Sequence, residues 1–201
     1  MYQSSFNEFE EYVTPSDIIE FLYCPRFTYF MKNLNIRQYE ENRFKVQIGR
    51  EKHLNKKLQN SKQIRKRIGG IIKDQEKYLI SKKLAIKGIV DEVYLINDGS
   101  YAPLDYKFAE YKEKDFETYK IQMALYSLVI EEVYKAKVNK FYLVYIRSKN
   151  LLKEIEFDEK LRKKCLKYIS DYRKILNGYY PKSTRSKARC IDCCYRNICE
   201  K

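Results

Sequence analysis

Four cysteines at opposite ends of the chain have the spacing of a metal-cluster site. Cys190, Cys193 and Cys199 form a Cys-x-x-Cys-x5-Cys run near the C-terminus, and Cys24 lies far upstream, directly before Pro25. Iron–sulfur clusters are held by sets of cysteine thiolates, and in the bacterial ferredoxin run the remote cysteine also precedes a proline. The spacing therefore favours an iron–sulfur cluster that ties the two ends of the fold together.

Other readings of these cysteines stay open. Structural zinc also accepts four cysteines, but usually as two close pairs, and a site without metal is a third possibility. A local site of Cys190, Cys193, Cys194 and Cys199 is less favoured, because successive residues seldom point at one metal. A disulfide framework is disfavoured in a chain of 201 residues without a secretory signal.

A second set of reactive residues lies in the middle of the chain. Asp91 is followed by the turn sequence around Asp98-Gly99, and then by Asp105-Tyr106-Lys107. A hairpin centred on this turn places Asp91 opposite position 105 or 106. Side chains alternate along a strand, so Lys107 lies beside Asp105, while Tyr106 turns away and leaves its carbonyl at the same edge.

Two neighbouring carboxylates on a buried sheet repel each other unless a cation joins them. Mg²⁺ or Mn²⁺ held by Asp91 and Asp105 would polarise a phosphodiester and activate a water, with Lys107 orienting that water or steadying the developing charge. The alternative is a solvated hairpin with an Asp–Lys pair on its surface.

Two predicted helices supply further candidates. His53, the single histidine, follows Gly49 by one turn, and a glycine there would let the helix rest against the sheet and bring the imidazole to the carboxylates. Gln122 and Tyr126 are also one turn apart, so they could contact nucleic acid or surround the site. The alternatives are a surface or satisfied core histidine and, for Tyr126, a place in the core.

Composition indicates a polyanionic partner. Lys and Arg number 41 against 27 Asp and Glu, which gives a net charge of +14, the usual footprint of nucleic-acid binding. An AT-rich genome would explain the abundance of lysine, but it would not explain why the net charge is positive. The N-terminus lacks a secretory signal and no apolar run is long enough to span a membrane, so a cytoplasmic protein is expected.

The periodicity predicts one main domain in which a strand meander is flanked by helices. A helix from Pro15 should break at Cys24-Pro25, and Cys165 falls on the apolar stripe of a late helix as a buried thiol. The expected helices are 44–60, 114–138 and 158–178, the expected strands are 78–83, 84–96, 101–108, 140–147 and 151–157, and a basic segment follows at 182–189.

Taken in order, these motifs resemble a known family. Gly49-x3-His53, Gly88-x2-Asp91, Asp105-x-Lys107 and Gln122-x3-Tyr126 look like the motifs of RecB-type nucleases in the PD-(D/E)xK superfamily. With the one-plus-three cysteines, the chain closely resembles the Cas-four family of CRISPR-associated exonucleases. The resemblance implies an α/β, restriction-endonuclease-like fold whose mixed central sheet is flanked by helices. It implies a single RecB-like domain over 1–201, with 14–35 and 180–201 forming the cluster region.

The resemblance also implies a set of cofactors and residue roles. A 4Fe-4S cluster would be held by Cys24, Cys190, Cys193 and Cys199, and Mn²⁺ or Mg²⁺ by His53, Asp91, Asp105 and the Tyr106 carbonyl, with Lys107 as the catalytic lysine. Such enzymes cleave single-stranded DNA, with 5′ to 3′ exonuclease activity best known. They trim and select prespacers by their adjacent motif, alongside the Cas-one and Cas-two integration proteins.

Two expectations and two rival functions complete the prediction. Because imidazole is a borderline ligand, a site containing His53 should work at least as well with Mn²⁺ as with Mg²⁺. The cluster is expected to staple the fold and shape a DNA channel without redox chemistry. The rivals are a non-catalytic DNA-binding subunit of the integration complex and a RecB-like repair nuclease.

Overall fold

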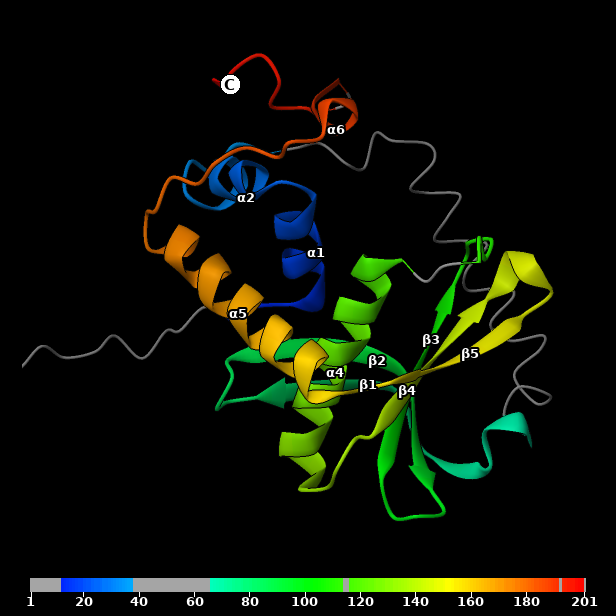
Figure 1. Cartoon of the computed structure of the whole chain (residues 1–201). Coiled ribbons are helices and arrows are strands. Elements are labelled where there is room, and N and C mark those ends of the chain that lie inside the picture. Colours follow the sequence, from blue (N-terminus) through cyan, green and yellow to red (C-terminus); the bar gives the residue numbers. More distant parts are fainter. Residues whose placement is uncertain (1–11, 38–65, 114–115, 192, 201) are drawn as a thin grey trace, which may run out of the picture.

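The computed structural model describes residues 12–37, 66–113, 116–191 and 193–200, which form an α/β fold around one five-stranded sheet (Figure 1). The strands follow each other in chain order across the sheet. β1 to β3 form an antiparallel meander, β3 and β4 are parallel, and β5 is antiparallel to β4. The mixed sheet confirms the predicted fold class. The strands are β1 (Gly70–Ser81), β2 (Ile86–Ile96), β3 (Tyr101–Lys107), β4 (Lys140–Tyr145) and β5 (Leu151–Glu156).

The turn between β2 and β3 fixes the register of the meander. Gly99 adopts a positive φ of 80°, which costs glycine little. Asp98 Oδ1 accepts hydrogen bonds from the Ser100 amide at 2.9 Å and from its hydroxyl at 2.6 Å. Glu92 consequently pairs with Leu104, so the next step along the hairpin brings Asp91 beside Asp105, as predicted.

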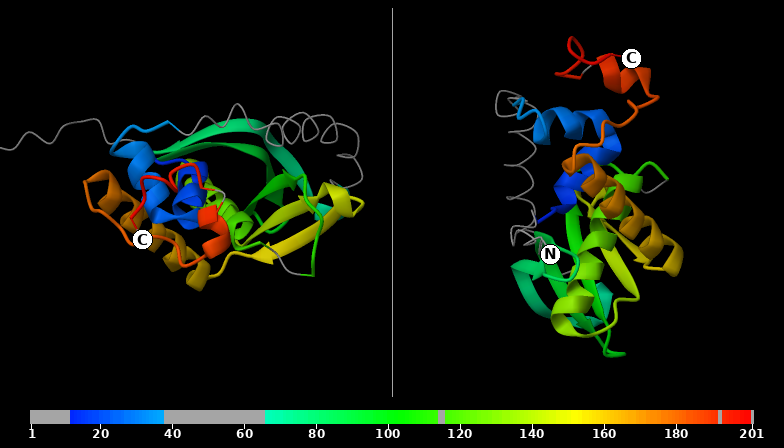
Figure 2. Two further views of the ribbon diagram at one scale, coloured as in Figure 1. Left: turned by 90° about the horizontal axis from the view of Figure 1, so that it is seen from above. Right: turned by 90° about the vertical axis from the view of Figure 1, so that its left-hand side faces the viewer.

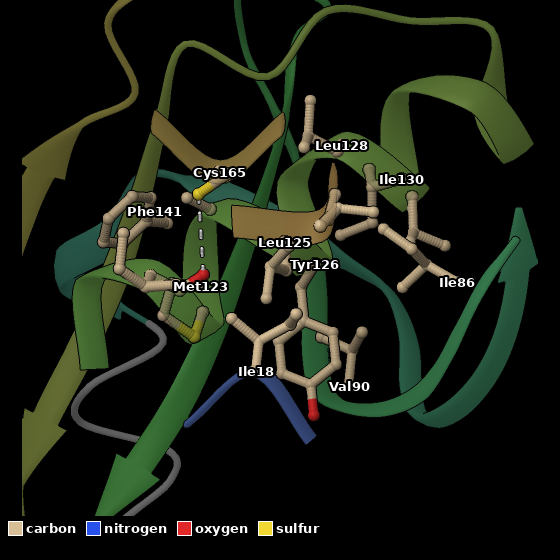
Figure 3. Packing of buried hydrophobic residues seen from close by; sticks show 14 of the residues in the cluster. Ile18, Ile86, Val90, Met123, Leu125, Tyr126, Leu128, Ile130, Phe141 and Cys165 are labelled. Atoms are coloured by element: carbon tan, nitrogen blue, oxygen red, sulfur yellow. Dashed lines mark hydrogen bonds between the residues drawn. The ribbon is translucent and has the colours of Figure 1, made fainter. Parts of the chain in front are cut away.

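Helices cover one face of the sheet. α4 (Glu117–Tyr134) carries the chain from β3 to the parallel strand β4 and lies against the sheet, while α5 (Glu159–Leu176) and α1 (Pro15–Tyr23) pack on α4 (Figure 1). In the main hydrophobic core, Ile18, Val90 and Tyr126 lie close together (Figure 3). None of the helices in the described ranges is long and apolar enough to cross a membrane.

Cys165 belongs to this core, as predicted. Its side chain is fully buried and its Sγ lies 3.9 Å from the carbonyl oxygen of Ile121 (Figure 3). Burial raises the pKa of the Cys165 thiol to about 12, so the group stays neutral in the fold. This is a core residue and not a ligand.

The first helical segment breaks where the sequence predicted. α1 begins with a capping box in which the Thr14 hydroxyl and the Asp17 carboxylate bond each other's backbone amides. Cys24 has extended dihedrals and separates α1 from α2 (Pro25–Lys32). Proline opens a helix easily because its missing N–H would be unpaired there, so the chain turns at the cysteine.

Segments from the N-terminal and C-terminal parts of the chain meet at one end of the molecule. α2 and the short α6 (Lys187–Ile191) lie together, away from the sheet (Figures 1 and 2). A small apolar cluster joins α2 to the segment that follows α6, since Phe27 and Phe30 of α2 pack on Tyr195.

The bounds of some elements differ from the prediction. β1 starts eight residues earlier, at Gly70 instead of Tyr78, and α4 covers Glu117–Tyr134 instead of 114–138. β4 ends at Tyr145 because a 3-10 turn, Ile146–Ser148, follows it. The predicted helix 44–60, with Gly49 and His53, lies outside the described residues.

Candidate active site and cysteine pocket

Asp91 of β2 and Asp105 and Lys107 of β3 lie together on two neighbouring inner strands of the sheet. The Tyr106 backbone amide donates a hydrogen bond to Asp91 Oδ2 at 3.1 Å, which fixes the Asp91 carboxylate beside β3. Lys107 Nζ lies 2.6 Å from Asp105 Oδ2. The predicted grouping of these residues is therefore present in the fold.

Gln122 and Tyr126 of α4 face this group from above the sheet. The Lys107 ammonium donates a hydrogen bond to Gln122 Oε1, so the lysine is held between a carboxylate and an amide. The pKa of Tyr126 is raised to about 12, mainly by burial; the charges of Asp105 and, less strongly, Asp91 also contribute to this rise, and a hydrogen bond with Gln122 opposes it. Both carboxylates thus act on the Tyr126 hydroxyl, which stays protonated.

Gly88 explains how Tyr126 approaches β2. A Cβ at this position would lie 2.9 Å from Tyr126 Cε1 and 3.2 Å from Pro15 Cδ, closer than packed carbon atoms tolerate. The glycine therefore lets α4 and the start of α1 close on the strand three residues before Asp91. The close approach of Tyr126 and Pro15 therefore explains why a glycine precedes Asp91 by three residues in this motif.

Most of this site is shielded from water. Asp105 is 8% exposed, and the Lys107 side chain is 12% exposed. Low exposure strengthens electrostatic interactions inside the site. One buried and one half-buried carboxylate, Asp105 and Asp91, lie beside one lysine. Such a donor set suits Mg²⁺ or Mn²⁺, since hard cations prefer oxygen.

Glu92 is a functional candidate that the sequence reasoning did not assign. It directly follows Asp91 but points to the opposite face of the sheet and is 1% exposed. Its carboxylate accepts hydrogen bonds from Tyr94 at 2.5 Å and from Tyr106 and Gln75 at 3.3 Å. Because Tyr106 also bonds Asp91 through its backbone, Glu92 anchors the central residue of the site from behind. Strand alternation alone could have placed Glu92 on that face.

The four predicted cluster cysteines line one pocket. Cys24, Cys190, Cys193 and Cys199 surround it together with Phe27 and Phe30. Burial raises the pKa of the Cys193 thiol, and the charges of the other three cysteines raise it further. In the described part of the chain all cysteines are free of disulfides.

A backbone amide and two arginine side chains contact the cysteine sulfurs and the backbone around this pocket. The Thr184 amide lies 3.4 Å from Cys24 Sγ. Arg26 lies 3.7 Å from Cys199 Sγ and donates to the Pro181 carbonyl at 2.9 Å. Arg189 bonds the carbonyls of Leu22 and Tyr23, each at 2.9 Å. The pocket is thus built from both ends of the chain.

Neither site is a closed cage for a single ion. Within the described ranges, no three His, Cys, Asp or Glu side chains converge closely enough to hold one. The thiols instead surround a shared space, which suits a multi-atom cluster. At the acidic site, His53 lies outside the described residues and the remaining predicted ligand, the Tyr106 carbonyl, belongs to the backbone.

Comparison with known proteins defines the class. Residues 35–200 match the PD-(D/E)XK nuclease superfamily, and the chain belongs to that family. The fold is similar to that in the crystal structure of SSO0001, with a TM-score of 0.60 and 18% sequence identity. The alignment covers 97% of this chain and 88% of SSO0001. The chain also aligns with a protein named as a candidate exonuclease from Eubacterium rectale, with a TM-score of 0.58, 16% identity, and coverage of 100% and 94%.

More similar sequences narrow the comparison. The CRISPR-associated exonuclease Cas4 of Francisella tularensis subsp. novicida is 29% identical over 190 residues, 90% of each chain. The CRISPR-associated exonuclease Cas4 of Thermoproteus tenax is 26% identical over 187 residues, 93% of each chain. A Cas4/endonuclease Cas1 fusion of Leptospira interrogans is 28% identical over 125 residues, 59% of this chain and 23% of the fusion.

Proposed function

We propose that the protein is a metal-dependent exonuclease that degrades single-stranded DNA in the 5′ to 3′ direction. The observation that carries the proposal is the convergence of Asp91, Asp105, Lys107 and Gln122 between the inner strands β2 and β3 and helix α4. Membership of a nuclease superfamily supports it.

Each side chain has a role in this proposal. Asp91 and Asp105, with the Tyr106 carbonyl and His53, would hold Mg²⁺ or Mn²⁺. When bound, such an ion polarises a phosphodiester and lowers the pKa of a water. Lys107, fixed by Asp105 and Gln122, places a positive charge where the attacked phosphate develops negative charge. Tyr126 remains a neutral hydroxyl that can donate a hydrogen bond to that phosphate.

The decisive test is cleavage of end-labelled single-stranded DNA by anaerobically purified protein. Lys107→Ala should lower the rate by roughly 100-fold or more, the usual cost of removing one stabilising group from a transition state. Lys140→Ala is the matched control, because Lys140 starts β4, away from the site, and pairs with Glu154 at 2.9 Å. Equal rates for both variants would contradict the proposal, and no cleavage by folded wild type would favour the DNA-binding subunit. The surviving label gives the polarity, and Mn²⁺ should support higher rates than Mg²⁺.

We infer that the cysteine pocket takes a 4Fe-4S cluster and that the cluster has a structural role. Four thiols from both ends of the chain, brought together by α2 and the C-terminal segment, support this inference. Beside the pocket runs a groove of about 640 Å³, and its lining in the described part of the chain contains several cations and no carboxylate. Its cations are Arg26, Lys182, Arg185, Lys187 and Arg196. They would contact DNA phosphates.

The similarity to Cas4 proteins supports a role in CRISPR adaptation. We propose that the enzyme trims prespacer overhangs and selects them by their adjacent motif, together with Cas1 and Cas2. The Cas4/Cas1 fusion of Leptospira interrogans supports the first partnership. Mixing the three proteins with a duplex carrying single-stranded overhangs should give shortened, integrated products only when Lys107 is intact.

A further inference from the structure

A row of aromatic rings lies beside the active-site lysine. Phe116 and Tyr119 at the start of α4 have ring centroids 5.2 Å apart, and Tyr119 is 6.4 Å from Tyr145 at the end of β4. Tyr145 is in turn 5.2 Å from Tyr111, in the loop after β3. We call these four residues the aromatic row. The sequence reasoning assigned none of them a role in the site.

The row passes through the core and has one end in solvent. Tyr145 is fully buried, whereas Phe116 is 42% exposed. Phe116 occupies the N-cap of α4 and makes no capping hydrogen bond with its side chain. Residues with short polar side chains are strongly preferred at that position, so helix capping does not explain the phenylalanine.

The row is connected directly to the catalytic group. Lys107 Nζ lies 4.7 Å from the centre of the Tyr119 ring and 2.6 Å from Asp105 Oδ2. At the other end, Lys153 Nζ lies 4.9 Å from the centre of the Tyr111 ring. Rings that stack with bases and cations that follow phosphates are the two components of single-strand binding surfaces.

We propose that Phe116 and Tyr119 form a stacking site for an unpaired nucleobase next to the scissile phosphate. This inference rests on the proposed nuclease function and deepens it. A base in a duplex is covered on both faces by its neighbours, whereas an unpaired base can leave the stack and lie on the exposed Phe116 ring. The site would therefore contribute to the choice of single-stranded DNA.

Kinetics with and without bases test the contact. For oligothymidylate, Phe116→Ala should raise KM roughly 5- to 10-fold, at the low end of what base–aromatic stacking contributes, with kcat little changed because the interaction is uniform binding. An abasic oligomer of the same length should show the same KM for wild type and variant. Phe116→Tyr should restore the low KM, and Val133→Ala, 41% exposed near the other end of α4, is the control.

A structural role for Phe116 would give a different result. A local folding defect would raise KM for both oligomers. If the ratio of KM for oligothymidylate to KM for the abasic oligomer is the same in Phe116→Ala as in wild type, the proposal is overturned. An unchanged KM for oligothymidylate overturns it as well.

Fluorescence provides a test that needs no cleavage. The chain contains no tryptophan, so Phe116→Trp introduces a single indole at the proposed contact. With Ca²⁺ in place of the activating metal, oligothymidylate should quench this indole and the abasic oligomer should not. Tyr78→Trp, at an exposed position of β1, should respond to neither.

The two proposals fail in distinguishable ways. If wild type cleaves DNA but neither quenching nor a KM change appears at Phe116, only the stacking site is wrong. If wild type cleaves nothing while Phe116→Trp is quenched by bases, the stacking site stands and the nuclease function falls.

Discussion

Adjacent acidic residues in β2 have different surroundings and therefore different uses. Asp91 accepts a hydrogen bond from the Tyr106 amide and acts on Tyr126 of α4, whereas Glu92 faces a group of hydroxyl and amide donors behind the sheet. A buried carboxylate needs such donors, since burying a charge without them costs several kcal/mol. The same backbone segment thus carries a reactive acid and its anchor.

Adjacent cysteines allow an equally sharp comparison. Cys193 lines the cysteine pocket, but Cys194 does not and is exposed. Cys193→Ser should remove most of the bound iron and sulfide, because a cluster needs thiolate ligands. Cys194→Ser should retain both. Iron and sulfide analysis with the visible absorption spectrum of anaerobically purified protein measures the difference, and iron loss in Cys194→Ser alone would revive the local four-cysteine alternative.

At the scale of residues, the sequence predicts the site residues whose positions are set by a local turn or by a recognisable motif. Asp91, Asp105 and Lys107 were found because the Asp98-Gly99 turn sets their register. Phe116 and Tyr119 could not be assigned to the site from the sequence, because their nearness to Lys107 depends on how α4 is placed over β3. The spacing of the four cysteines predicted a common site, and they line one pocket.

At the scale of elements, the contact between α4 and β2 depends on Gly88. Gly88→Ala would place a methyl group 2.9 Å from the Tyr126 ring. Overpacking of this kind typically costs about 1–3 kcal/mol, so we expect a lower free energy of unfolding by roughly that amount. Displacing Tyr126 should also slow cleavage at a temperature where the variant is fully folded. Urea unfolding followed by circular dichroism measures the first effect.

A control within the same strand separates packing from strand propensity. Ile89→Ala removes an exposed side chain, 58% accessible, and should change stability little. If Gly88→Ala were as stable and active as wild type, the steric account of this motif would be wrong.

Element boundaries were predicted less well than element types. β1 begins at Gly70, but charged residues occupy positions 73, 74, 76 and 77, and the register shifts between Ile72 and Asp74. These features hide the period-two pattern that marks a strand. By contrast, α5 was predicted within two residues because its apolar stripe is regular and Asp158 caps it.

At the scale of the whole molecule, the sheet and the cysteine pocket form separate ends joined by α1, α5 and the C-terminal segment (Figure 1). The end with the pocket has only a small apolar cluster of its own, built on Phe27, Phe30 and Tyr195. Small cores of this kind usually depend on a metal or a disulfide for stability. The cations of the adjacent groove lie on α2 and on the C-terminal segment, which together form this end.

Removing the cluster should therefore weaken folding and DNA binding together. Anaerobic iron chelation should lower Tm, by roughly 2–4 °C for each kcal/mol lost in a domain of this size, and lower the affinity for labelled single-stranded DNA in fluorescence anisotropy. Substituting Lys182 and Arg185 by alanine should weaken binding without changing Tm, since both are exposed. Chelation that abolishes cleavage while Tm and affinity stay unchanged would instead assign the cluster a direct part in the chemistry.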